Sequence, residues 1–315
     1  MSKRQLGNTD LAIAPLVLGG NVFGWTADRA TSFQLLDRFV DAGFEAIDTA
    51  DVYSMWVPGH QGGESESIIG EWMAARGNRD RIVLITKVGM PMGAGRKGLS
   101  ARWIESEVEE SLRRLRTDRI DLYFSHVFDE QVPLEETLRA HERLISAGKV
   151  RYIGASNHTA GQLGAALKTS ADLGLPRYEV LQPHYNLYDR AGYEGALRDL
   201  AVKEGLGVIT YFSLASGFLT GKYRGSGDLG KSPRGGGMGK YLDARGLAIL
   251  AALDRVAAAH GAQPAEAALA WLIASRGVTA PIASATSLEQ MESLIRSTRL
   301  ALTAEEFAEL DRSGA

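Results

Sequence analysis

The sequence predicts an α/β fold, a (β/α)8 barrel of the TIM type with an N-terminal β-hairpin and extra C-terminal helices. Short apolar runs alternate along the chain with stretches of helical period, as expected of repeated strand–helix units. The apolar residues within a run are continuous, which is typical of parallel strands buried on both faces. Eight such units within about 250 residues fit a closed barrel better than an open, doubly wound sheet.

The predicted barrel strands are the apolar runs themselves. They are residues 15–19, 46–47, 82–85, 122–124, 150–154, 180–181, 207–211 and 280–283. Before the first run, residues 5–6 and 11–13 flank the turn-forming residues 7–10, which predicts a small hairpin. No shift of composition marks a domain boundary, so we expect residues 1–315 to form a single barrel domain.

The helical stretches carry recognisable signals. Apolar residues recur every three or four positions between 104 and 115, and Glu109–Arg113 and Glu110–Arg114 are spaced to form ion pairs on the opposite face. Pro133 opens the following helix. The alternation of strands and helices is therefore supported by local signals as well as by apolar period.

Two segments, 54–64 and 217–241, interrupt this rhythm. The second is rich in glycine and basic residues, and a long loop of this kind inside a compact domain is usually functional or disordered. Beyond it we expect helices near 243–260 and 264–275, then a final helix at 303–313 that starts with a capping box.

Composition narrows the class of protein. The chain has no cysteine, which excludes disulfides, thiolate nucleophiles and thiolate metal sites. Its formal net charge is −3 and its basic residues are scattered, so we expect neither a nucleic-acid nor a membrane partner. No apolar run approaches the roughly 20 residues that span a bilayer. The expected location is the cytoplasm, and the oligomeric state is left open.

Three polar residues end successive strands of the predicted barrel. Asp48, Lys87 and His126 end the second, third and fourth strands, and Tyr53 follows just beyond Asp48. Strand C-termini share one rim of such a barrel, and neighbouring strands lie about 4.8 Å apart. We therefore expect the four side chains to meet.

Such a group suits proton donation to a carbonyl. A phenol titrates near pH ~10, and a neighbouring ammonium lowers that pKa toward a useful range. Asp48 would keep Lys87 charged and in place, and His126 would hydrogen-bond the substrate oxygen. A lone Asp or Lys at a strand end is more often a structural ion pair, and a lone His is more often a satisfied polar residue. The argument rests on all four together.

With these residues in view, the chain resembles the aldo-keto reductase family over essentially its whole length. Several ordered motifs carry the resemblance, and any one of them alone is a weak signal. The motifs are Asp-Thr-Ala-Asp-Val-Tyr at 48–53, Thr-Lys at 86–87, the strand that ends in His126, Gly-Ala-Ser-Asn at 154–157, Gln-Pro-His-Tyr-Asn-Leu at 182–187, and residues 213–223.

The resemblance implies reversible hydride transfer between a nicotinamide cofactor and a small carbonyl or alcohol. Tyr53 would be the general acid in reduction, Lys87 would depress its pKa, Asp48 would hold Lys87, and His126 would orient the carbonyl. A histidine at this position fits reduction of an aldehyde or ketone in this family.

The same resemblance assigns residues to the cofactor, NADP(H). Ser156, Asn157 and Gln182 would hold the nicotinamide carboxamide, and Tyr211 would stack on the ring. The alternative for Tyr211 is an aromatic packed at the barrel rim. Residues expected to line the pyrophosphate through backbone N–H groups and one charge are Ser213, Leu214, Gly217, Leu219 and Lys222.

The last motif departs from the family pattern. Ser284, Thr286, Ser287 and Gln290 stand where the family holds the adenosine 2′-phosphate before a helix, a suitable place for an anion. Many relatives have Lys or Arg at the first or second of these positions, and neither is basic here. We expect NADP(H) and keep NAD(H) open. Candidates for the missing charge are Lys222, Arg224, Lys231, Arg234 and Arg296.

Substrate contacts are expected from aromatic residues near the rim: Phe23, Trp25, Trp56 and Phe128. An aromatic mouth suits an apolar or ring-bearing substrate, although scattered rim aromatics are as often packing residues. A regulatory or redox-sensor subunit on the same fold is one alternative to an enzyme. A metal-dependent barrel hydrolase is another, but the six histidines show no metal-binding spacing, so we expect no metal.

Overall fold

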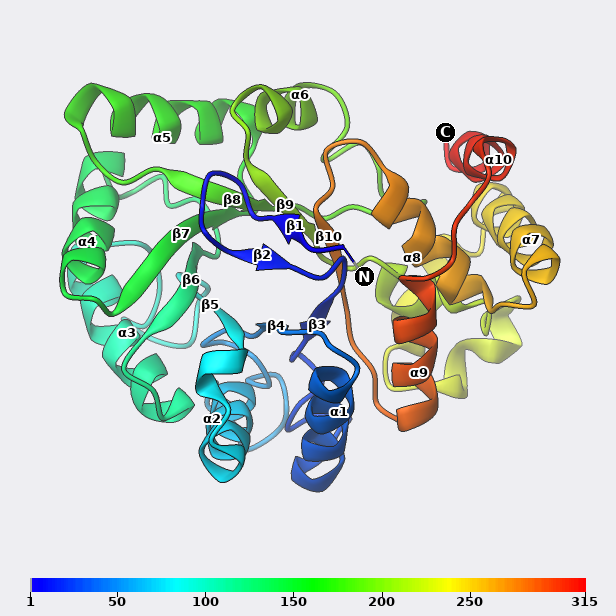
Figure 1. The fold of residues 1–315 in the computed structure, drawn as a ribbon, viewed down its shortest axis with the longest axis horizontal. Helices are drawn as coiled ribbons and strands as arrows, with labels where there is room; N and C mark the ends of the chain where they lie inside the picture. Colours follow the sequence, from blue (N-terminus) through cyan, green and yellow to red (C-terminus); the bar gives the residue numbers. More distant parts are fainter. Residues whose placement is uncertain (1) are drawn as a thin grey trace.

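A computed structural model describes residues 2–315. Parallel strands form a closed barrel in the order β10-β3-β4-β5-β6-β7-β8-β9, and helices surround it (Figure 1). The (β/α)8 fold expected from the sequence is confirmed, and a separate two-stranded antiparallel hairpin precedes it. The register brings Gly19 beside Asp48 and Lys87 beside Phe124, so that the C-terminal strand ends form one rim.

Each predicted apolar run contains or overlaps one barrel strand. The strands are β3 (Val17–Gly19), β4 (Ala46–Asp48), β5 (Val83–Val88), β6 (Ile120–Ser125), β7 (Val150–Ser156), β8 (Tyr178–Gln182), β9 (Gly207–Thr210) and β10 (Ala280–Ala283). Every residue of β3, β4, β6, β9 and β10 is buried. Burial on both faces explains why these segments are apolar without alternation.

The helices alternate with the strands and cover the barrel. They are α1 (Arg29–Asp41), α2 (Glu64–Arg76), α3 (Ala101–Leu115), α4 (Leu134–Ser146), α5 (Ala160–Leu173), α6 (Ala196–Lys203), α7 (Ala244–Ala259), α8 (Pro264–Ala274), α9 (Leu288–Ser297) and α10 (Ala304–Ser313). The capping box expected at the last helix is present between Thr303 and Glu306. No helix within residues 2–315 is long and apolar enough to cross a bilayer.

The prediction that Glu109–Arg113 and Glu110–Arg114 form ion pairs along α3 is wrong. Arg113 pairs with Glu110, one turn away, while Arg114 points inward to the buried carboxylates of Glu66 and Glu107. Glu109 pairs instead with Lys149. Helical spacing alone did not reveal that one arginine of this face is buried between α2 and α3.

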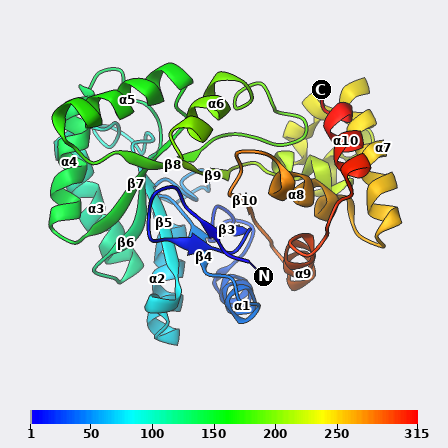
Figure 2. The same cartoon turned by 45° about the horizontal axis from the view of Figure 1, so that its top comes forward.

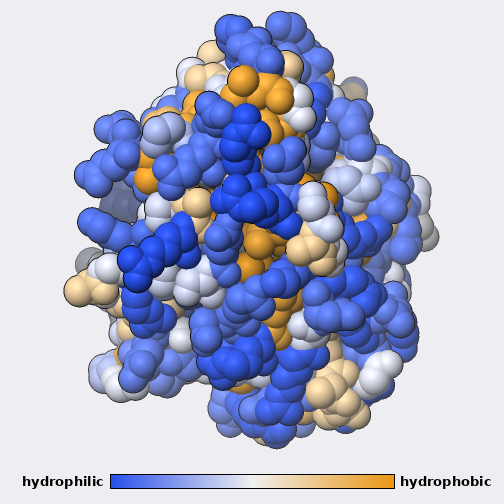
Figure 3. Space-filling model, turned by 90° about the vertical axis from the view of Figure 1, so that its left-hand side faces the viewer, coloured by the Kyte–Doolittle hydropathy of each residue, from blue (hydrophilic) through white to orange (hydrophobic). Residues whose placement is uncertain are grey.

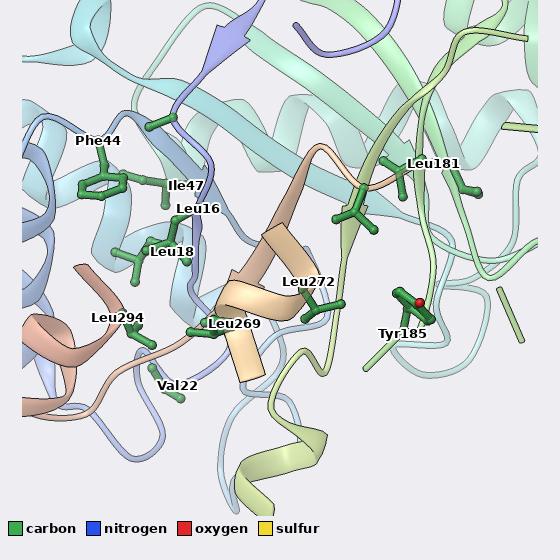
Figure 4. Close-up of a cluster of buried hydrophobic side chains, with 14 of the residues drawn as sticks. Leu16, Leu18, Val22, Phe44, Ile47, Leu181, Tyr185, Leu269, Leu272 and Leu294 are labelled. Carbon is green, nitrogen blue, oxygen red and sulfur yellow. The ribbon is translucent and has the colours of Figure 1, made fainter. Parts of the chain in front are cut away.

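Two apolar clusters make up the core. The larger lies between the barrel and its helices, and Figure 4 shows part of it, with Leu18 of β3 and Ile47 of β4 near Leu294 of α9. The smaller fills the barrel interior and includes Ile85 and Phe124. Outside this core, the face over α3 to α5 is mostly hydrophilic (Figure 3).

The hairpin β1 (Arg4–Gln5) and β2 (Ala12–Ile13) covers the end of the barrel at which the strands begin (Figures 1 and 2). Its turn residue Gly7 has a φ of +61°, and a Cβ there would lie 2.3 Å from the carbonyl oxygen of Glu179, so only glycine fits. Leu6, Leu11 and Ile13 belong to the interior cluster. Arg4 Nη1 donates to the carbonyls of Ile273 and Thr279, at 2.8 and 3.1 Å.

The glycine-rich segment 217–241 is more ordered than a loop. Three 3-10 helices run through it: η2 (Ala215–Thr220), η3 (Ser226–Lys231) and η4 (Gly235–Tyr241). A fourth 3-10 helix, η1 (Arg79–Arg81), lies elsewhere in the chain, just before β5. The ring of Phe218 in η2 stacks on Tyr241 in η4, with centroids 5.1 Å apart. This contact folds the segment back on itself.

Candidate active site

The four polar side chains at the strand ends lie together. Asp48 is the last residue of β4, Lys87 is next to last in β5, and His126 directly follows β6. Tyr53 lies in the turn after β4. The closed barrel places these ends on one rim, as parallel strands in register must.

Lys87 is the centre of the group. Its Nζ donates to Asp48 Oδ2 at 2.7 Å, to the Thr49 carbonyl at 2.7 Å and to Tyr53 Oη at 3.0 Å. An ammonium has three protons to donate, so all are used. Lys87 has no exposed surface and Asp48 is 1 % exposed. Burial lowers the pKa of Lys87, and the Asp48 carboxylate opposes that shift.

The pKa of Tyr53 departs from the expected direction. Burial raises it well above its usual value, and the Asp48 carboxylate raises it further. Oη lies 3.0 Å from the Lys87 ammonium and 3.4 Å from Asp48 Oδ2. Burial is the largest cause and the Asp48 carboxylate acts in the same direction, so the pKa rises even though the ammonium is in contact. Tyr53 is therefore a protonated phenol at neutral pH in this state.

His126 is a buried, neutral imidazole beside the phenol. It is 8 % exposed, and its ring centroid lies 6.2 Å from that of Tyr53 in an edge-on arrangement. Burial, and secondarily the Lys87 ammonium, hold the pKa of His126 well below its usual range. Its Nδ1 has no hydrogen-bond partner within the described part of the chain. A neutral histidine carries one ring N–H, which can donate a hydrogen bond to a carbonyl oxygen.

Gln182 forms a contact that the sequence analysis missed. Its Nε2 donates to Asp48 Oδ1 at 2.9 Å, so both carboxylate oxygens of Asp48 are satisfied, one by Lys87 and one by Gln182. The signal was available, since Gln182 ends β8 on the same rim. The resemblance had assigned its amide to the cofactor alone.

The residues expected around the nicotinamide adjoin one another. Asn157 Nδ2 donates to Ser156 Oγ at 3.2 Å and to the His126 carbonyl at 2.9 Å. Asn157 Oδ1 accepts a hydrogen bond from Tyr211 Oη at 2.6 Å. Ser156 Oγ donates to the Gln182 carbonyl at 3.0 Å. The four residues thus form a connected polar edge at the ends of β7, β8 and β9, with Gln182 joined to it through its backbone carbonyl.

The segment after β9 divides into accessible and buried residues. Ser213 is 1 % exposed and Leu219 is fully buried in the core, so neither side chain is open to a ligand. Leu214 is half-buried and Gly217 has a φ of +103°. A Cβ on Gly217 would lie 3.7 Å from Lys222 Nζ, which places that ammonium against the turn.

Positive φ angles in residues other than glycine concentrate at this rim. Asn157, Phe212, Ala215 and Ser216 have φ between 47° and 56°, and Ser54 has a φ of 73°. Such conformations are strained for L-residues and commonly occur where ligands bind. In residues 2–315 the remaining example is Arg116, which ends α3 far from the rim in sequence.

The last predicted motif forms the start of α9. Ser287 is the N-cap and accepts from the Gln290 N–H. Gln290 Oε1 accepts from the backbone N–H of Thr286 at 2.9 Å, and Ser284 Oγ donates to Asn21 Oδ1 at 2.7 Å. These polar groups surround a helix N-terminus, which favours an anion. Asn21 is a further residue of this corner that the sequence analysis did not name.

Three of the five basic residues that could hold the cofactor phosphate already form ion pairs with carboxylates of the protein. Arg224 pairs with Asp254, Lys231 with Asp228, and Arg296 with Glu266. Lys222 and Arg234 make no ion pair with any described carboxylate. The Arg234 guanidinium lies over the indole of Trp25, 4.9 Å from the ring centroid. These two remain able to meet a bound anion.

The aromatic residues predicted to contact the substrate do not lie together in the structure. Trp25 and Trp56 meet edge to face at 5.6 Å, and Trp56 lies 6.2 Å from the Tyr53 ring. Trp56 is 48 % exposed. Phe23, in contrast, is fully buried in the core, and Phe128 packs against His158. The structure thus joins only the two tryptophans to the phenol.

Comparison with known proteins identifies the family. The sequence model of the Aldo/keto reductase family matches residues 15–315. The chain belongs to this family. Aldo/keto reductases are oxidoreductases that generally use NAD(P)H and act on small carbonyl compounds, and the rim described above lies where this barrel fold carries its active sites.

Curated relatives cover nearly all of this aldo/keto reductase. An uncharacterized oxidoreductase YrpG of Bacillus subtilis is 35 % identical, over 97 % of this chain and 93 % of its own. Protein tas of Escherichia coli is 29 % identical, over 99 % and 97 %. Norsolorinic acid reductase stcV of Emericella nidulans is 32 % identical, over 96 % and 78 %.

The described residues contain no group of three or more His, Asp or Glu side chains placed to hold a metal ion. The match to the Aldo/keto reductase family replaces the alternative of a metal-dependent hydrolase on the same barrel, which the sequence analysis had kept open.

Proposed function

We propose that this aldo/keto reductase uses NADP(H) to reduce an aldehyde or ketone to an alcohol, with Tyr53 as the general acid. The observation that carries the proposal is the contact of the Tyr53 hydroxyl with Lys87 Nζ, at 3.0 Å, beside the buried Asp48. A cofactor-binding sensor would need no proton donor held in this way. The proposal takes residues 1–315 as a single domain working in the cytoplasm.

The proton follows a short path in this proposal. The cofactor supplies the hydride to the carbonyl carbon when bound. Tyr53 Oη gives its proton to the carbonyl oxygen, and the Lys87 ammonium, already in contact, stabilises the phenolate that forms. Asp48 keeps Lys87 charged within the barrel. His126, neutral and adjacent, donates to the same oxygen and so fixes its position.

The residues of the structure fit a phosphate-bearing nicotinamide cofactor. The connected edge of Ser156, Asn157, Gln182 and Tyr211 supports a site for the carboxamide and ring. Lys222 and Arg234 lack carboxylate partners among the described residues, and the α9 N-terminus is lined by polar groups. We favour NADP(H) over NAD(H) because these two cations have no carboxylate partner among the described residues and can pair with a cofactor phosphate. Parallel fluorescence titrations with NADPH and NADH test this preference, and we expect the lower Kd for NADPH.

The substrate we propose is an apolar or ring-bearing carbonyl compound. The exposed Trp56 lies next to Tyr53 and Trp25 contacts Trp56, so the two indoles offer flat apolar surfaces near the phenol. A relative that is named for the reduction of norsolorinic acid supports a ketone or aldehyde as the substrate class.

The test is Tyr53→Phe, which removes the proton donor and keeps the ring. We expect kcat on a panel of aromatic aldehydes and ketones to fall by roughly 10²–10⁴-fold, the usual contribution of a general acid. The Kd for NADPH should stay within about twofold, since no cofactor contact is assigned to Oη. Tyr152→Phe, near the hairpin, is the matched control. Full activity of Tyr53→Phe would refute the proposal, and tight cofactor binding without any turnover by the wild type would favour the sensor.

A further inference from the structure

The imidazole of His184 stacks on the ring of Tyr211 and has no role in the proton transfer proposed for Tyr53. The His184 ring stacks on the Tyr211 ring with centroids 5.2 Å apart and planes inclined by 24°. The backbone causes this arrangement, because the two residues form a parallel bridge just beyond β8 and β9. Phe212 contacts both rings edge-on, at 5.3 and 5.2 Å. With one face of Tyr211 covered, another ring can stack only on its other face.

The His184 ring is itself held by an anion. Its Nε2 lies 3.2 Å from Asp189 Oδ2, and the fully buried Asn186 donates to the same oxygen at 3.0 Å. Asn186 also donates to the Phe212 carbonyl at 3.0 Å. Burial would raise the pKa of Asp189, but the hydrogen bonds from His184, Asn186 and Tyr241 lower it to about 2. Asp189 is therefore a carboxylate at neutral pH.

The same carboxylate connects the ring pair to the segment 215–241. Tyr241 Oη donates to Asp189 Oδ2 at 2.9 Å, and Tyr241 is the last residue of η4. Its ring stacks on Phe218 of η2, in the part of the segment that includes Gly217. Asp189 thus joins the support of Tyr211 to the turn expected to hold the cofactor phosphates.

We propose that His184, held by Asp189, is a positioning residue for hydride transfer. It supports the face of Tyr211 that lies away from the nicotinamide and ties that ring to the segment 215–241. The inference rests on the proposed function, in which Tyr211 stacks on the nicotinamide. Its physical basis is that a shift of about 1 Å between reacting groups costs up to 10²-fold in rate.

The experiment compares His184→Ala, which removes the stack, with His184→Phe, which keeps a flat ring. Single-turnover hydride transfer is followed at saturating NADPH, and the primary isotope effect is measured with NADPH deuterated at C4. We expect His184→Ala to be roughly tenfold slower and to show a larger isotope effect on kcat, and His184→Phe to stay within about threefold of wild type. The Kd for NADPH should change less than the rate.

A control variant and the isotope effect together distinguish a positioning role of His184 from a purely structural one. His260→Ala removes a histidine from a surface ion pair with Glu306, and it should leave the rate unchanged. Thermal melting identifies any variant that fails to fold. His184→Ala with a wild-type rate and isotope effect would overturn the inference.

Tyr211→Ala separates failure of the inference from failure of the proposed function. If Tyr211→Ala slows hydride transfer and His184→Ala does not, only the role of His184 is wrong. If neither Tyr211→Ala nor Tyr53→Phe affects hydride transfer, the proposed function itself fails.

Discussion

Gln182 donates a hydrogen bond to Asp48 across the barrel, from β8 to β4, at 2.9 Å. Asp48 in turn accepts from Lys87, so the orientation of the buried lysine depends on a residue 134 positions away from its carboxylate. The contact gives Gln182 a role in the protein without cofactor, apart from any role toward the nicotinamide.

The first prediction concerns this hydrogen bond. Gln182→Leu leaves one oxygen of a buried carboxylate without a donor, so we expect the free energy of unfolding to fall by about 1–3 kcal/mol. In an Asp48→Asn background the same change should cost less, because the charge is gone. Urea titration of both single variants and the double variant gives the coupling energy. Strictly additive losses would contradict the contact.

A second prediction compares neighbouring arginines on α3. Arg114→Met removes the cation from the buried Glu66 and Glu107, and leaving a buried charge unpaired typically costs 3–5 kcal/mol. Arg113→Met, whose partner Glu110 is exposed, should change the unfolding free energy by no more than about 0.5 kcal/mol. Chemical denaturation of both variants checks the difference, and equal losses would show that Arg114 is not an essential partner.

The third prediction concerns acid stability. Burial lowers the pKa of His141 to about 4, whereas an unfolded histidine titrates near 6.5. The unfolded chain therefore binds this proton more readily, so stability is lost as the pH falls from about 6.5 toward 4. The full loss is on the order of 3 kcal/mol, and His126 adds to it in the same direction.

The measurement is a series of urea titrations between pH 7.5 and 5. His141→Asn should be less stable than wild type at neutral pH, because Ser125 loses one of its two hydrogen-bond partners and keeps only Tyr178, but its stability should fall less steeply with acid. His260→Asn, at a surface ion pair, is the control. An unchanged pH dependence in His141→Asn would mean that this buried imidazole does not determine the acid limb.

The fourth prediction tests the phosphate contacts. Lys222 lies against the Gly217 turn and has no ion-pair partner in residues 2–315, so Lys222→Met should weaken NADPH binding by about tenfold, or 1.4 kcal/mol. Lys231→Met, which removes a lysine already paired with Asp228, should change the Kd little. Equal effects of the two variants would remove Lys222 from the proposed cofactor site.

The fold and the grouping of the four polar residues could be predicted because both follow from local pattern. Continuous apolar runs define strands buried on both faces, and residues such as Asp48 and Lys87 at the ends of neighbouring strands must meet. The partners of Gln182 and Arg114 could not be predicted in this way. They depend on which side chains face each other across the barrel or between helices, and that information is not local.

Two other departures have physical reasons. The pKa of Tyr53 is raised by burial and by the Asp48 carboxylate, 3.4 Å from its Oη, and no sequence pattern specifies how deeply the phenol is buried or how close that carboxylate lies. Phe23 follows the first barrel strand, and the turn there directs its ring into the core while Trp25, two positions later, meets Trp56. Proximity in sequence to the rim was not enough to fix the direction of a side chain.

The hairpin of residues 4–13 has a consequence for the order of assembly in the cell. It is synthesised before the barrel strands, yet Arg4 binds the carbonyl of Ile273, 269 residues later, and its apolar residues enter a barrel that closes only when β10 is in place. During translation the hairpin therefore lacks these partners until β10 has been synthesised. Its docking is expected to complete the molecule rather than to nucleate it, and a chain that stalls before residue 280 would leave that end of the barrel uncovered.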